Sequence, residues 1–165
     1  MPDIAFRETA ILTFAALLLA AAMWDALSYR IPNLLCLALL AIWPFYISNL
    51  PVTGLTGALL AAGIVFVFGC LAWLRGWMGG GDVKLLAIVA LWAGWPDFVA
   101  TFFVISIAGG LLALAMKTPA RRMFGLAATP GADIAPAIAA PVLPYGIAIA
   151  CGGLFLAWRL LSMAA

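Results

Sequence analysis

The chain has 165 residues, of which 68% are hydrophobic and only 8% are charged, and its formal net charge is +2. Soluble chains carry about 25% charged residues, so a soluble domain of this composition could not cover its own surface. The small net charge gives no reason to expect nucleic acid as a partner, and the absence of histidine excludes a histidine base or metal ligand. The composition therefore predicts a membrane protein whose surroundings are the lipid bilayer.

Six apolar runs follow one another along the chain, with short connections except for the longer segment 117–140. A membrane-spanning helix needs roughly 20 apolar residues, so we expect an all-α, polytopic membrane protein with about six transmembrane helices. We expect one domain, residues 1–165. The predicted spans are Thr9–Leu27, Leu34–Asn49, Leu55–Leu74, Val83–Trp95, Phe98–Met116 and Val142–Leu161. Pro96 is expected to end the fourth span, and segment 117–140, rich in Ala, Pro and Gly, is expected to be a flexible loop.

Basic residues are distributed unevenly over the connections. Arg7 and Arg159 lie on one side of the predicted membrane. The alternate connections hold Arg30, Arg75, Lys84, Lys117, Arg121 and Arg122. Because Lys and Arg stay preferentially on the cytoplasmic side, we expect these three connections to face the cytoplasm.

Two acidic residues lie on this predicted cytoplasmic side. Asp25 comes near the end of the first span, and Asp82 opens the fourth span directly after three glycines, residues 79–81. A helix from Asp82 to Trp95 rises about 20 Å, whereas the hydrocarbon core is about 30 Å thick. Asp82 is therefore predicted to be recessed, and an ionisable residue at such depth indicates a functional site. The glycines can take positive φ and admit another chain closely, so we expect them to shape this site.

Structural roles for the same residues stay open. Asp82 could cap the fourth span, Asp25 could pair with Arg30, and Lys84 could extend to the membrane surface. If the acids act together, two neighbouring carboxyl groups share a proton. One then takes a proton from water while the other donates to a substrate carbonyl. This is the chemistry of an aspartic protease, and it requires neither a cofactor nor a metal.

Three short motifs lie in and beside the predicted spans. The stretch GGGDVKLLAIVALWAG contains a G-x-G-D motif, Asp25 precedes an Ile-Pro-Asn at residues 31–33, and Pro144-Tyr145-Gly146 precedes most of the last span. Together these motifs resemble the type IV prepilin peptidase family of membrane aspartic proteases, which often has Pro-Phe-Gly at the third motif, and the resemblance extends from about Trp24 to Gly153. It implies Asp25 and Asp82 as catalytic residues, an active-site loop with Gly79, Gly80, Gly81 and Lys84, and Pro144 and Gly146 as candidate substrate-groove residues.

The resemblance implies an endopeptidase that removes the basic leader from prepilins or pseudopilins at the cytoplasmic face of the bacterial inner membrane. Larger members carry an insert with C-x-x-C zinc motifs after the first span, and they N-methylate the new terminus. Here no C-x-x-C occurs and few residues follow Asp25 before the second span. The chain is thus most similar to compact peptidases of tight-adherence (Flp-type) pili, and N-methyltransferase activity is not expected. It departs from the family in having only Arg30 as a basic residue between Asp25 and Ile-Pro-Asn.

Other functions are consistent with parts of the pattern. Recessed carboxylates and a glycine-broken span also occur in small proton- or cation-coupled transporters, which would place the acids near the membrane midplane. A non-catalytic component of a pilus or secretion machine would function without either acid. A relative of the presenilins or signal-peptide peptidases is disfavoured by Lys84 and by the Ile-Pro-Asn context.

Overall fold

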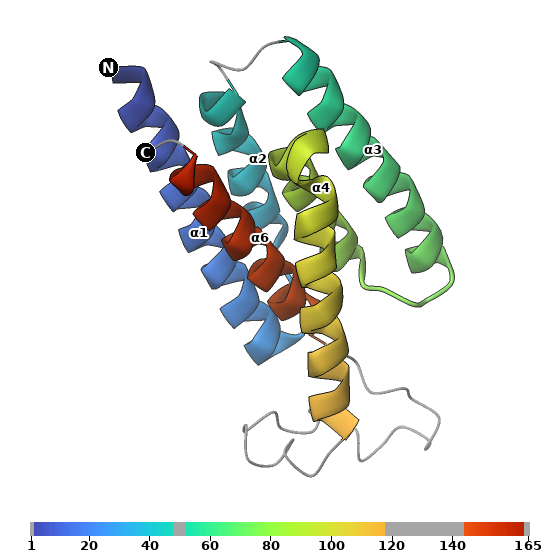
Figure 1. Cartoon of the computed structure of the whole chain (residues 1–165). Helices are drawn as coiled ribbons and strands as arrows, with labels where there is room; N and C mark the ends of the chain where they lie inside the picture. The colour runs from blue at the N-terminus through green and yellow to red at the C-terminus, as the bar shows by residue number, and fades with distance from the viewer. Residues whose placement is uncertain (1, 48–51, 118–143, 164–165) are drawn as a thin grey trace.

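The computed structural model of the chain describes residues 2–47, 52–117 and 144–163. Every regular element within these ranges is an α-helix, namely α1 (Pro2–Ser28), α2 (Asn33–Ile47), α3 (Val52–Leu74), α4 (Gly80–Lys117) and α6 (Tyr145–Ser162). Figure 1 shows the helices side by side in a bundle, with the start of α1 and the end of α6 at the same end. The predicted all-α fold class is confirmed.

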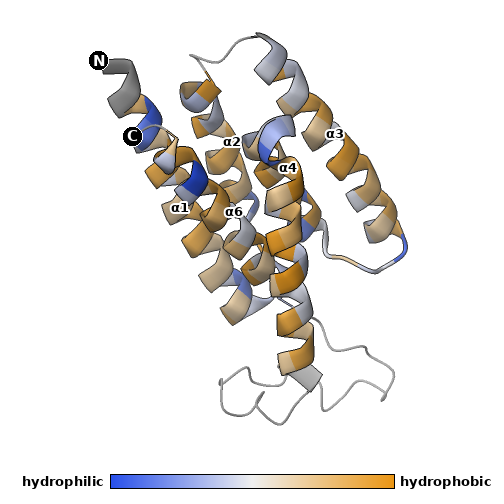
Figure 2. Cartoon of the chain, viewed as in Figure 1, coloured by the Kyte–Doolittle hydropathy of each residue, from blue (hydrophilic) through white to orange (hydrophobic). Residues whose placement is uncertain are grey.

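Four helices are long and apolar enough to cross a membrane, over Phe6–Ser28, Thr53–Leu74, Gly80–Ala115 and Tyr145–Ser162. Helix α2 is also apolar but has only 15 residues. Large side chains such as Phe68 and Phe103 are more than half exposed, and Figure 2 shows hydrophobic residues on the outer faces of the helices. Because proteins in water rarely expose large apolar patches, the chain is a multi-pass membrane protein. The number of six spans stays a prediction.

Several predicted boundaries differ from the observed ones. Helix α1 begins before the predicted Thr9, and α4 begins at Gly80 rather than at Val83. The last residues of the predicted second span lie outside the described residues. So does the predicted loop at 117–140, except for Lys117, which is the last residue of α4.

Helix α4 is broken at Gly94, where the backbone has φ 58° and ψ −170°. Ala87 and Ala90 before the break pack in one cluster with Phe98 and Phe102 after it, and Figure 1 shows the chain turning back here. The fourth span therefore ends close to the predicted Trp95, but the break lies at Gly94 rather than at Pro96. Positive φ is readily adopted by glycine, whereas proline at the start of a helix loses no hydrogen bond. The break yields two halves of α4 that lie side by side.

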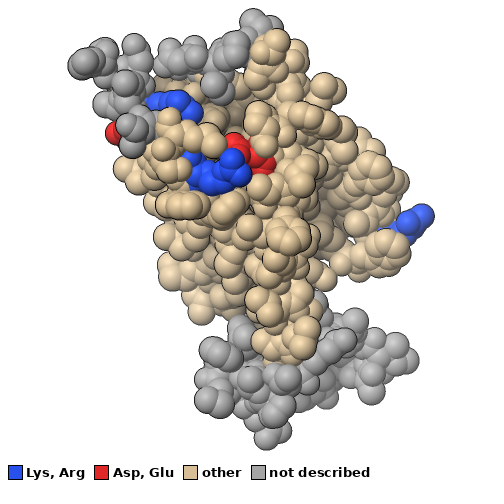
Figure 3. Space-filling model, viewed as in Figure 1, with Lys and Arg blue, Asp and Glu red and all other residues tan. Residues whose placement is uncertain are grey.

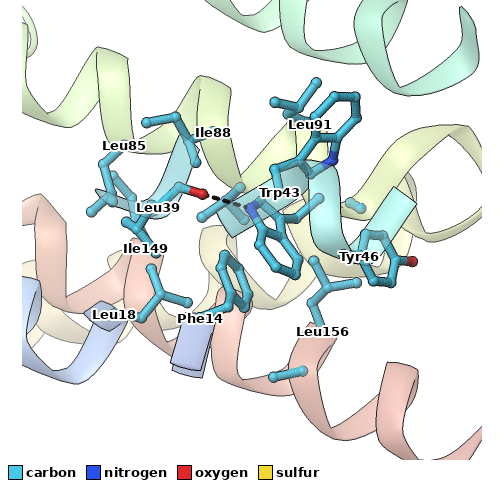
Figure 4. Close-up of a cluster of buried hydrophobic side chains, with 14 of the residues drawn as sticks. Phe14, Leu18, Leu39, Trp43, Tyr46, Leu85, Ile88, Leu91, Ile149 and Leu156 are labelled. Carbon is cyan, nitrogen blue, oxygen red and sulfur yellow. Dashed lines mark hydrogen bonds between the residues drawn. The ribbon is translucent and has the colours of Figure 1, made fainter. Parts of the chain in front are cut away.

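An aromatic stack joins three helices in the core. The ring of Trp92 in α4 stacks on Phe14 of α1 at 4.2 Å and on Tyr46 of α2 at 5.0 Å between centroids. Trp92 Nε1 donates a hydrogen bond of 3.2 Å to the carbonyl oxygen of Leu39, the dashed line in Figure 4. The stack fixes α1, α2 and α4 relative to one another, and two of these helices carry the acids predicted to form the site.

Charged groups lie at the two ends of the bundle. Beside the start of α1 and the end of α6, Arg7 lies 5.4 Å from the ring centroid of Tyr46, and Arg159 pairs with the buried Asp97 at 3.0 Å. Figure 3 shows charged side chains gathered in the upper part of this face and a wide uncharged surface below them. The observed separation of charge agrees with a chain that exposes its middle to lipid.

Candidate active site

Asp25 lies in the last turn of α1 and is 3% exposed. Its Oδ2 accepts a hydrogen bond of 2.8 Å from the backbone N–H of Gly146, in the first turn of α6. A Cβ on Gly146 would lie 2.7 Å from this same oxygen, which is closer than real Cβ atoms approach. A residue without a side chain is therefore required for α6 to hold Asp25 in this way.

Asp82 is the third residue of α4 and is half-buried. Its carboxyl group accepts a hydrogen bond from the backbone N–H of Gly79. This is the contact that an acidic residue in the first turn makes with the residue preceding a helix. Asp82 thus does not occupy the N-cap position considered from the sequence, but it does stabilise the start of α4 from within the helix.

The structure brings Asp25 and Asp82 together at one end of the bundle. The two carboxyl groups are close enough for their charges to interact. Among the described residues, the one ion pair is that of Asp97 with Arg159, so the alternative pairing of Asp25 with Arg30 does not form. A group of three or more His, Cys, Asp or Glu side chains that could hold a metal ion does not occur within the described ranges.

The glycines before Asp82 differ from the predicted irregular loop. Gly80 and Gly81 belong to the first turn of α4, and the described glycines with positive φ are Gly76 and Gly94. The predicted close approach does occur, because a Cβ on Gly81 would lie 3.2 Å from Cβ of Ile31. Missing side chains, rather than unusual dihedral angles, let the connection from α1 to α2 contact α4 beside Asp82.

Lys84 links α4 to the start of α2, since its Nζ donates a hydrogen bond of 2.9 Å to Oδ1 of Asn33. Lys84 was predicted from the sequence as a residue of the active-site loop. Asn33 was quoted in a motif but was given no role. Pro32 could have identified Asn33, because a proline directly before a helix marks where the helix starts. Asn33 is then a polar residue at the first position of an apolar helix.

A cavity of about 530 Å³ lies between α2, α3 and the first half of α4. Asn33 and Lys84 line it together with apolar residues such as Leu37 and Phe66. Pro144 and Gly146, the predicted groove residues, do not line this cavity. Both are buried, and Gly146 packs directly on Asp25.

The bundle of apolar helices and the two carboxyl groups at one of its ends are those of a multi-pass membrane protein with a candidate hydrolytic site. The family model described as the type IV leader peptidase family matches residues 12–114, and the chain therefore belongs to this family. The matched range contains Asp25, Ile31-Pro32-Asn33 and Asp82 but ends before α6. Comparison with curated proteins and with solved structures found no match. Membership makes the chain a leader-peptidase-like protease and implies prepilin substrates in general.

Proposed function

We propose that the protein is an aspartic endopeptidase that cleaves the leader from Flp-type prepilins or pseudopilins, with Asp25 and Asp82 as its catalytic residues. The observation that carries the proposal is that these two carboxyl groups, one in the last turn of α1 and one in the first turn of α4, lie at one end of the bundle within electrostatic range of each other. Positions 25 and 82 are far apart in the chain, and the family match spans both of them.

In the proposed reaction, one carboxylate removes a proton from water, and the water oxygen attacks the carbonyl carbon of the scissile peptide. The other carboxylic acid gives its proton to the carbonyl oxygen. The tetrahedral diol then collapses, the C–N bond breaks, and the leaving nitrogen takes up a proton. Because Gly146 holds Oδ2 of Asp25, Oδ1 is the oxygen that acts on water or on the substrate in this proposal.

The orientation and the scope of the reaction are also proposals. Arg30 and Arg75 lie at the same end as the acids, and Lys84 lines the neighbouring cavity, which supports a site that faces the cytoplasm across the inner membrane. Four residues, Tyr29 to Pro32, join α1 to α2, which leaves no room for a zinc-binding insert there. The proposed activity is therefore proteolysis without N-methylation.

The positions of the acids bear on the alternative of a transporter. Asp25 lies three residues before the end of α1, and Asp82 lies two residues after the start of α4. Both carboxyl groups are thus in terminal turns, whereas coupling carboxylates of transporters lie near the midplane. This arrangement favours the peptidase.

Co-expression with a Flp-type prepilin tests the proposal. The wild-type chain should shorten the prepilin by its leader, as measured by mass spectrometry. Asp25→Asn and Asp82→Asn should each abolish cleavage at an unchanged amount of membrane-inserted protein. Normal processing by either variant would show that the two residues are not a catalytic pair.

A further inference from the structure

We propose that the cavity between α2, α3 and the first half of α4 receives the transmembrane helix of the substrate. We further propose that Lys84 and Asn33 bind main-chain carbonyl groups where that helix unwinds next to the cleaved bond. The inference rests on the proposed peptidase function and adds to it a docking surface and two positioning residues.

The cavity opens at the side of the bundle. Helix α3 packs on α4 and α2 packs on α1 and α4, whereas α2 and α3 have little contact with each other. Figure 1 shows α2 and α3 standing apart with α4 between them. The cavity walls Leu37 and Phe66 are 62% and 47% exposed. A hydrophobic helix could thus enter from the bilayer and bury these side chains.

Lys84 and Asn33 carry the polar groups at the end of the cavity nearest the acids, and the rest of the lining is apolar. Lys84 is the single charged residue among those that line the cavity, and one of its three N–H donors binds Asn33. Two donors on Lys84 and the NH₂ group of Asn33 remain. A substrate helix that unwinds in the membrane leaves carbonyl groups without partners, which is costly unless the protein supplies donors. An acyl chain of a lipid presents no such carbonyl groups along its length, so these donors favour a peptide as the occupant.

The positions of Lys84 and Asp82 explain why unwinding is needed. Two residues along an α-helix correspond to a rotation of about 200°, so these side chains project from different sides of α4. A substrate held in the cavity must therefore leave its helical path and cross the start of α4 to reach the acids. Gly79 and Gly80 offer no side chain to obstruct that crossing.

Site-specific photo-crosslinking tests the docking surface. A benzophenone amino acid is placed at Leu37 or Phe66 in the full-length Asp82→Asn chain, in membranes that contain a Flp-type prepilin. Leu19 and Phe103 serve as controls, because their side chains are also about half exposed or more but do not line the cavity. We expect adducts with prepilin from the cavity positions only. Adducts of equal yield from the controls, or cavity adducts with lipid alone, would overturn the proposal.

Cleavage by the wild-type chain is measured with the same prepilin to separate the two proposals. If prepilin is cleaved but never cross-links in the cavity, the docking proposal is wrong while the peptidase assignment stands. If it cross-links in the cavity but is not cleaved, docking stands and the peptidase assignment is wrong.

Lys84→Met tests the positioning role. We expect the adduct yield at Leu37 to stay unchanged while kcat falls about tenfold, the loss expected for a hydrogen bond to a charged donor. Lys84→Arg keeps donors and should recover most of the rate. Arg75→Met removes a basic residue at the same end that does not line the cavity, and it should leave kcat within about twofold. A loss of adduct and of thermal stability in Lys84→Met, with no rescue by Arg, would identify a purely structural residue instead.

Discussion

Replacing Gly146 by alanine would test whether the backbone of α6 positions Asp25. A Cβ at residue 146 would lie 2.7 Å from Oδ2, 2.9 Å from Cβ and 3.0 Å from Cγ of Asp25. Since favourable carbon contacts lie at about 3.5–4.0 Å, Asp25 or α6 must move by roughly 0.5–1 Å. The hydrogen bond from Gly146, now 2.8 Å, would lengthen as they separate.

This displacement sets the expected size of the effect. Overpacking of this kind costs about 1–3 kcal/mol of stability, and a misplacement of about 1 Å can cost a hundredfold in rate. We expect kcat for prepilin cleavage to fall by about 10- to 100-fold, while the variant still unfolds cooperatively on heating. The assay is gel-resolved cleavage of purified prepilin in detergent, with a melting curve on the same sample.

The matched control is Gly63→Ala in α3, where an added Cβ meets nothing within 4 Å. Its cleavage rate should equal that of the wild type. If Gly146→Ala also cleaves at the wild-type rate with an intact fold, α6 does not position Asp25 and the reasoning is refuted.

Three further substitutions test the fold away from the acids. Arg159→Met leaves the buried Asp97 without its partner, so we expect a loss of about 1–3 kcal/mol in the free energy of unfolding; an unchanged midpoint in a denaturant titration would contradict this. Trp92→Phe removes the indole donor to the Leu39 carbonyl, which should lower stability by about 1–2 kcal/mol, with Leu91→Met as a conservative control. Gly94→Ala forces alanine into positive φ, which should cost about 1–2 kcal/mol of stability and lower the melting temperature. The cost comes from the backbone and not from a clash, because the added Cβ would lie an ordinary 3.6 Å from the nearest side-chain atom.

Much of the helical layout could be predicted because apolar runs long enough to span a bilayer have few other stable structures. Leu74 ends the third span in both the prediction and the structure. The fourth and fifth spans were separable in the sequence because Pro96 interrupts the run. Their separation at Gly94 was not predicted, since an isolated glycine in a helical pattern does not reveal its sign of φ.

The side of the membrane on which both acids lie was predictable, because that prediction needs only the number of spans and the positions of the basic residues in the connections between them. Alternation of basic residues put Asp25 and Asp82 on one side, and the structure places them at one end of the bundle. Their environment was not predictable in this way. The contact of Gly146 with Asp25 and the pairing of Lys84 with Asn33 depend on how distant helices pack, and no local pattern encodes a contact over 121 positions.

That separation has a consequence for biogenesis. A ribosome produces Asp25 in the first helix, whereas the backbone donor that holds Asp25 is synthesised 121 residues later, in the last of the described helices. A nascent chain that has inserted both acids still lacks this donor until α6 joins the bundle. The order of synthesis therefore delays completion of the site until the helices around it have assembled, which would protect neighbouring membrane proteins from an unfinished peptidase.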